Sequence, residues 1–127
     1  MHMIDLLYVN YNSSKLLCKS IESVIENSAI RCPHVFVWDN RSNDDVDRIE
    51  RLFPQATLIR SDKNVGFARG INELIQRSRS PYLIILNPDT LVRKGFVDDA
   101  IGFLEDNPEV GILGPQMLGL YFKGGPI

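Results

Sequence analysis

Four short polar segments of the sequence each carry asparagine or aspartate directly after an apolar run. They are Asn10-Tyr11-Asn12, Asp39-Asn40, residues 61–66 and Asn87-Pro88-Asp89-Thr90. Their carboxylate and amide oxygens could bind a nucleotide or a hard divalent cation, and the tyrosine ring could stack on a base. In any single loop such residues are ordinary turn formers that cap helices. The recurrence of the same residue types in all four loops favours a binding site.

The segments that position these loops alternate between two hydrophobic patterns. Short β-branched and aromatic runs predict strands at 4–9, 34–38, 56–60 and 82–86, with a fifth expected at 110–113. Between them, helical spacing predicts a helix capped by Ser13 or Ser14, a second capped by Asp44, and others from Phe67 and Phe96. The apolar stripes expected to face the core include Leu52 in the second helix and Phe67 in the third.

Alternating strands and helices of this kind predict a three-layer α/β/α fold with a mostly parallel sheet. In an open parallel sheet, ligands bind outside the carboxyl ends of the strands. We therefore expect the four polar loops to meet at one edge of the sheet.

Composition limits the classes of function. The chain has 127 residues, 44% hydrophobic residues and a net charge of −2, which is typical of one globular domain and argues against nucleic-acid binding. The sequence contains no GxGxxG, P-loop or GxSxG motif. A receiver-like signalling domain is a distant alternative, because the first loop carries no acid and stable acyl-phosphate formation would be needed.

Cysteine usage and hydropathy indicate a cytoplasmic setting. Cys18 and Cys32 are too few and too isolated for a disulfide framework, and Cys18 is expected to be a buried core thiol. We find no secretory signal, and the apolar runs are shorter than the roughly 20 residues that span a bilayer. Association with the inner face of the membrane stays open.

Four motifs together resemble one known family. Residues 9–12 (VNYN), 37–42 (VWDNRS), 64–72 (NVGFARGIN) and 83–90 (LIILNPDT) are similar in order and spacing to family 2 glycosyltransferases of GT-A fold. The likeness is strongest to the rhamnosyltransferase-like branch that builds cell-surface polysaccharide. It covers nearly the whole chain, so we expect a nucleotide-sugar-binding domain at 3–118 and an irregular tail at 119–127.

The resemblance implies a nucleotide-diphosphate sugar as donor. The family's nucleotide-binding positions correspond here to Val9, Tyr11, Asp39, Asn64, Gly66, Arg69 and Asn87. The position of Asp39 reads the base in the family, which implies a UDP- or dTDP-sugar, with a GDP donor less favoured. The alternative for Asp39 is a structural Asx turn with Ser42, and for Arg69 a solvated surface position.

Asn87-Pro88-Asp89 occupies the place of the family's DxD motif. The last acid of that motif usually holds the metal, so the resemblance implies Asp89 as the ligand of Mg²⁺ or Mn²⁺. Asn87 replaces the first acid, which weakens the expectation of metal binding.

The reaction implied is inverting transfer of the sugar to a saccharide acceptor. The family's catalytic base lies well past the DxD motif, and we assign no residue to it, because Glu105, Asp106 and Glu109 resemble a surface segment. The alternative is a non-catalytic nucleotide-sugar-binding module, or a truncated fragment that lacks the acceptor half. Such a fragment would expose an edge of the first or fourth strand and could form homo-oligomers.

Overall fold

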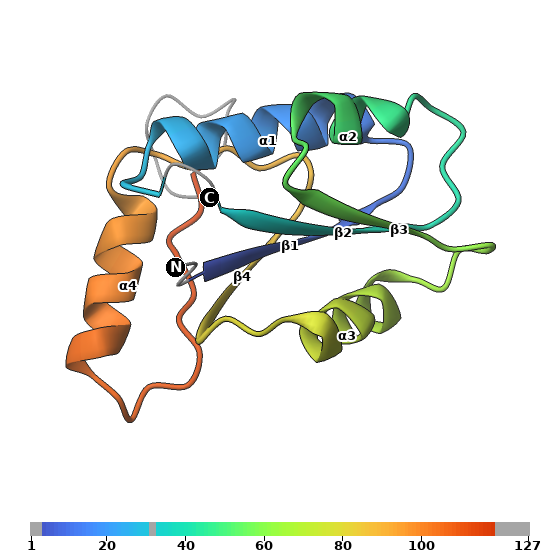
Figure 1. The fold of residues 1–127 in the computed structure, drawn as a ribbon. Coiled ribbons are helices and arrows are strands. Elements are labelled where there is room, and N and C mark those ends of the chain that lie inside the picture. Colours follow the sequence, from blue (N-terminus) through green and yellow to red (C-terminus); the bar gives the residue numbers. More distant parts are fainter. Residues whose placement is uncertain (1–3, 31–32, 119–127) are drawn as a thin grey trace.

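A computed structural model describes residues 4–30 and 33–118, which form a parallel sheet with helices on both faces (Figure 1). In chain order, the elements are β1 (Ile4–Asn10), α1 (Ser14–Glu26), β2 (His34–Asp39), α2 (Asp47–Leu52), β3 (Ala56–Arg60), α3 (Phe67–Arg77), β4 (Tyr82–Leu86) and α4 (Phe96–Asp106). The strand order is β3-β2-β1-β4, and every pair is parallel. The expected α/β fold is confirmed.

The two faces of the sheet bury separate apolar clusters. On one face, Leu6 and Tyr8 of β1 pack with Leu17 and Ile21 of α1, and the cluster extends to α2. On the other face, the cluster consists of Leu7, Val9, Phe36, Ile71 and Leu74, beneath α3. Alternate residues of each central strand are therefore buried by different helices, which explains why these strands read as continuous apolar runs.

A glycine sets the distance between α3 and the sheet. A Cβ atom at Gly70 would lie 2.8 Å from Cδ1 of Trp38 and 3.0 Å from Cγ2 of Val9. Any larger side chain would push the helix away from β1 and β2. This contact places the start of α3 close against the carboxyl ends of the two strands.

Three residues of the predicted apolar helix faces, Leu52, Phe67 and Ile75, are exposed. Leu52 is 53% exposed because α2 is a single short helix whose buried residue is Ile49. Phe67 is 50% exposed because it is the first residue of α3, at the edge of the sheet rather than over it. Ile75 of α3 is 40% exposed. The predictions for these three side chains were wrong.

The strand expected at 110–113 is also absent from the described residues, where this segment has no regular structure. A short apolar run becomes a strand only when another strand pairs with it, and this run has no such partner in the sheet. Ile112 is consequently 93% exposed.

The outer edge of the sheet beside β4 is unpaired within the described part of the chain. Leu83 and Ile85 of this strand are 36% and 48% exposed. The expectation of an exposed fourth strand is confirmed, whereas β1 is central and pairs on both sides.

Cys18 is buried, as expected, and its thiol is free. Cys32 and the tail expected at 119–127 lie outside the described residues. Among the helices of the described ranges, none is long and apolar enough to cross a bilayer.

Candidate functional site

The strand order reverses between β1 and β4. The chain moves from β1 through β2 to β3 in one direction and then returns to pair β4 with the other side of β1. In open α/β sheets, ligands bind at the carboxyl end of the strands where the order reverses in this way. The loops that begin at Tyr11 and Asn87 flank this point, and the loops after β2 and β3 lie beside it.

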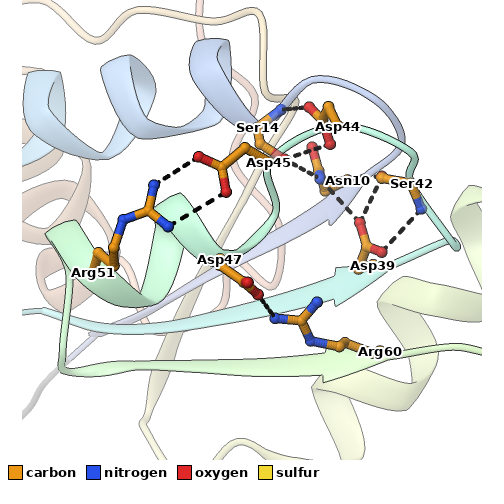
Figure 2. Close-up of polar contacts among 9 residues, drawn as sticks. All are labelled: Asn10, Ser14, Asp39, Ser42, Asp44, Asp45, Asp47, Arg51 and Arg60. Atoms are coloured by element: carbon orange, nitrogen blue, oxygen red, sulfur yellow. Dashed lines mark hydrogen bonds and ion pairs between the residues drawn. The ribbon is translucent and has the colours of Figure 1, made fainter.

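Hydrogen bonds between Asn10 and Asp39 join the ends of β1 and β2 (Figure 2). The two residues are partners in the parallel register, and Nδ2 of Asn10 donates to Oδ1 of Asp39 at 3.0 Å. The same Nδ2 also donates to Oγ of Ser14 at 3.0 Å. Within the described part of the chain, the buried Oδ1 of Asn10 has no hydrogen-bond partner.

The carboxylate of Asp39 forms the Asx turn that was one of its two expected roles. Its Oδ1 accepts from Oγ of Ser42 at 2.6 Å as well as from Asn10, and its Oδ2 accepts from the Ser42 amide at 3.0 Å. Each carboxylate oxygen can accept two hydrogen bonds, so Oδ2 retains one acceptor position. Asp39 is only 3% exposed.

Asp44 caps α1 rather than the helix that follows it. Its Oδ2 accepts from the backbone amide of Ser14 at 2.8 Å, and its Oδ1 accepts from Oγ of Ser14 at 2.9 Å (Figure 2). The predicted cap of α2 was therefore wrong, and α2 begins at Asp47. Ser13 is the N-cap residue of α1 but makes no capping hydrogen bond with its side chain.

Asn40 ties β2 to the loop before α3, a role that the sequence analysis missed. Its Oδ1 accepts from Nε1 of Trp38 at 3.0 Å and from the amide of Val65 at 3.1 Å, and its Nδ2 donates to the Gly66 carbonyl at 3.1 Å. The residue is 3% exposed. The only signal in the sequence was an amide side chain directly after the carboxylate of Asp39.

The loop into α3 leaves its polar groups open to solvent. Oδ1 of Asn64 accepts from the Gly66 amide at 2.9 Å, and Gly66 has φ 86°. A Cβ atom at Gly66 would meet nothing within 4 Å, so the backbone conformation rather than crowding requires glycine there. Arg69 is exposed and makes no ion pair with any residue in the described ranges.

The loop after β4 is a turn closed by Thr90. The amide and the hydroxyl of Thr90 donate to the Asn87 carbonyl at 3.1 Å and 2.7 Å. The turn leaves the side chains of Asn87 and Asp89 exposed at the carboxyl edge of the sheet.

A divalent cation fits this loop only with help from a ligand. Within residues 4–30 and 33–118, no three His, Cys, Asp or Glu side chains lie together as a metal site. Mg²⁺ is often held by one or two carboxylates together with substrate phosphates and water. Asp89 is suited to such a single contact.

Tyr11 and Val9 differ in what they can offer to a ligand. Tyr11 is 48% exposed at the end of β1, so its ring is available for stacking. Val9 packs its side chain under α3 and is 8% exposed. Only the main chain of Val9 could therefore contribute to a site.

Two exposed charged pairs join residues of α2 to the segments beside it. Arg51 donates to Asp45 at 2.6 Å, and this hydrogen bond lowers the pKa of the Asp45 carboxyl (Figure 2). Arg60 at the end of β3 pairs with Asp47. Both pairs are solvent-exposed, so we expect them to add little stability.

Comparison with known proteins agrees with this fold. The model of the family "Glycosyl transferase family 2" matches residues 6–120. The crystal structure of residues 1–349 of TarS from S. aureus superposes with a TM-score of 0.81 at 20% identity, over 100% of this chain and 39% of that one. A mannosyltransferase from Pyrobaculum calidifontis, in complex with GDP-Man and Mn²⁺, superposes with a TM-score of 0.73 at 20% identity, over 83% and 33%.

These findings define the class of the protein as a GT-A-type α/β domain. The chain belongs to glycosyl transferase family 2. A curated relative, an uncharacterised glycosyltransferase of Methanocaldococcus jannaschii, is 22% identical over 116 residues, which are 87% of this chain. The chain spans 40% of the length of that relative.

Proposed function

We propose that the carboxyl edge of the sheet binds the nucleotide of a UDP- or dTDP-sugar. One observation carries the proposal: the strand order reverses between β1 and β4, and the exposed Tyr11 and Asp89 lie in the loops that flank this reversal. A nucleoside diphosphate presents an aromatic base at one end and two phosphates at the other, and these loops supply a ring and a carboxylate.

Each of the predicted residues has a distinct proposed role. Tyr11 stacks on the base, and Oδ2 of Asp39 accepts a hydrogen bond from a base N–H with its remaining acceptor position. Asn64 and Gly66 shape the entry to α3, whose N-terminus and Arg69 favour the negative diphosphate. Asn87 contacts the ribose or a metal-bound water.

We propose that Asp89 holds Mg²⁺ or Mn²⁺ together with the donor diphosphate. When bound, the cation would neutralise the charge that develops on the leaving diphosphate. The structural neighbour determined with GDP-Man and Mn²⁺, and the complexes of TarS with UDP-GlcNAc and UDP, support a nucleotide donor.

For the whole protein, we propose inverting transfer of the sugar to a saccharide acceptor, in cell-surface polysaccharide synthesis of the rhamnosyltransferase-like type. The acceptor hydroxyl would lose its proton to a base and attack the anomeric carbon on the face opposite the leaving diphosphate. We assign no base. Glu105 lines a cavity of about 390 Å³ with Pro81 and Tyr82 at the start of β4, so it lies at the opposite edge of the sheet from Asp89.

A second candidate is a nucleotide-sugar-binding module without transfer activity of its own. The chain spans 39% of the TarS fragment that it matches, so residues outside this chain complete that neighbour. Donor binding is common to both candidates. From the sequence we propose a cytoplasmic location, and association with the inner face of the membrane stays an open alternative.

Calorimetric titration of UDP into the chain tests the proposal. We expect binding that strengthens with Mn²⁺ and loses this dependence in Asp89→Asn. Asp106→Asn, an exposed acid at the end of α4, is the matched control and should bind like the wild type. The absence of UDP and dTDP binding by a folded wild-type chain would refute the proposal, and sugar transfer to an acceptor would exclude the non-catalytic candidate.

A further inference from the structure

Arg41 has an unusual backbone conformation at the carboxyl edge of the sheet. Its φ is 62°, in the left-handed region, and Asn12 is the one other non-glycine residue with positive φ in the described ranges. Asparagine adopts this region readily, whereas a long side chain such as arginine does so at a cost. Strained residues that persist in a fold cluster at ligand-binding sites. Glycine would adopt this backbone conformation without strain, so the presence of arginine at position 41 points to a role for its side chain.

The side chain of Arg41 joins two of the four loops. Its Nη1 donates to the carbonyl oxygen of Asp62 at 2.9 Å, so the guanidinium extends from the loop after β2 to the loop after β3. A guanidinium carries five N–H groups, and Arg41 forms no ion pair with the described residues. It is exposed and has N–H groups left to donate.

We propose that Arg41 is a specificity-determining residue that reads a carbonyl oxygen of the donor base. This inference rests on the proposed donor site. Asp39, the last residue of β2, lies two residues before Arg41 and offers an acceptor through its Oδ2. Together the two residues present an acceptor and a donor to the edge of a base.

An acceptor beside a donor matches some bases and rejects others. Uracil and thymine carry an N–H next to a carbonyl, and guanine carries the same pair. In the ring pose that fits uracil, cytosine places a ring nitrogen without hydrogen opposite Asp39 and an amino group opposite Arg41, so both contacts would be mismatched. The pair therefore selects UDP, dTDP and GDP over CDP, and shape around Tyr11 would decide among the first three.

The substitution Arg41→Gly separates recognition from folding. Glycine relieves the left-handed strain, so we expect the midpoint of urea denaturation to stay equal to or rise above that of the wild type. Binding of UDP should weaken about tenfold, the typical effect of losing one charged hydrogen bond, while weak CDP binding should not change. The control Arg79→Gly removes an exposed arginine at the amino edge and should leave both affinities unchanged.

Calorimetry with UDP and CDP on these three proteins, with Mn²⁺ present, decides the question. Selective loss of UDP affinity in Arg41→Gly supports the inference. Unchanged UDP affinity, or an equal loss for UDP and CDP that points to a phosphate contact, overturns the inference and leaves the proposed function standing. If the wild-type chain binds no nucleotide, the proposed function and the inference both fail.

Discussion

Asn10 and Asp39 are opposite partners on neighbouring parallel strands, and Nδ2 of Asn10 lies 3.0 Å from Oδ1 of Asp39. The bond fixes the end of β1 against the end of β2. It also orients the carboxylate, which accepts further hydrogen bonds from the hydroxyl and the amide of Ser42. The loops of the proposed donor site are thus supported from within the sheet, before any ligand binds.

The substitution Asn10→Asp should destabilise the fold by about 2–4 kcal/mol, because it buries a second carboxylate beside Asp39. The penalty should shrink at about pH 4, where protonation removes the repulsion. Urea denaturation at both pH values measures the effect. The control Asn12→Asp adds the same charge at an exposed position, and an equal loss in both variants would contradict this account.

Gly70→Ala should lower the free energy of unfolding by about 1–3 kcal/mol, since the new methyl group would overlap Trp38 and Val9. Gly102→Ala is a control within α4, where nothing lies within 4 Å of the added Cβ. That change should stabilise the helix by roughly 0.5–1 kcal/mol. Fluorescence of Trp38 during chemical denaturation follows both variants, and opposite signs are expected.

Removal of the Asp44 side chain should cost about 1 kcal/mol, the usual value for a lost helix cap, because the carboxylate caps α1 from another loop. The variants Asp44→Ala and Ser13→Ala can be compared by thermal or urea denaturation. Ser13 makes no capping hydrogen bond with its side chain, so its loss should change stability by less than about 0.5 kcal/mol. A larger loss of stability in Ser13→Ala than in Asp44→Ala would show that Ser13, and not Asp44, is the main cap of α1, and would contradict the prediction.

Burial raises the pKa of the Cys18 thiol, so we expect this thiol to react slowly with thiol reagents in the folded protein. In a Cys32→Ala variant, Cys18 should react slowly with a thiol reagent when folded and rapidly in denaturant. The raised pKa contributes stability below the ordinary thiol value of about 8.5, and this contribution is lost as the pH rises through the folded-state pKa. The free energy of unfolding should therefore fall at alkaline pH more in the protein that contains Cys18 than in Cys18→Ala. An equal pH dependence of the two proteins would contradict a raised pKa for Cys18.

The exposed fourth strand should promote self-association. Leu83 and Ile85 are apolar and exposed on an unpaired edge strand, and such surfaces seek partners. Light scattering across micromolar concentrations should detect dimers, and Ile85→Lys should shift the population to monomer. A monodisperse monomer at every concentration would contradict the prediction.

The sequence predicted the sheet better than it predicted the contacts of single residues. The runs that became β1 to β4 are buried between helices and therefore hydrophobic throughout, which is a strong local signal. The cap from Asp44 to Ser14 joins residues 30 positions apart, and no local pattern reports such a contact. The same holds for Asn40, whose partners in the loop before α3 become neighbours only after the sheet forms.

Some features of the candidate site could likewise be predicted from the sequence, and others could not. The arrival of four polar loops at one edge followed from the parallel topology, which the alternation of elements indicated. The left-handed backbone of Arg41 and the tight packing at Gly70 depend on exact loop and helix placement, and residue type alone does not reveal them. The roles of Tyr11, Asp39, Arg69 and Asp89 toward a ligand stay predictions.

The most direct test of the central claim is to map UDP binding onto backbone amides by NMR, with Mg²⁺ present. The account predicts chemical-shift changes at the carboxyl edge, in the amides of Tyr11, Ser42, Gly66 and Asp89. Changes confined to the amino edge, around His34 and Ser80, would contradict it. No change at any amide at saturating UDP would show that this edge does not bind the nucleotide.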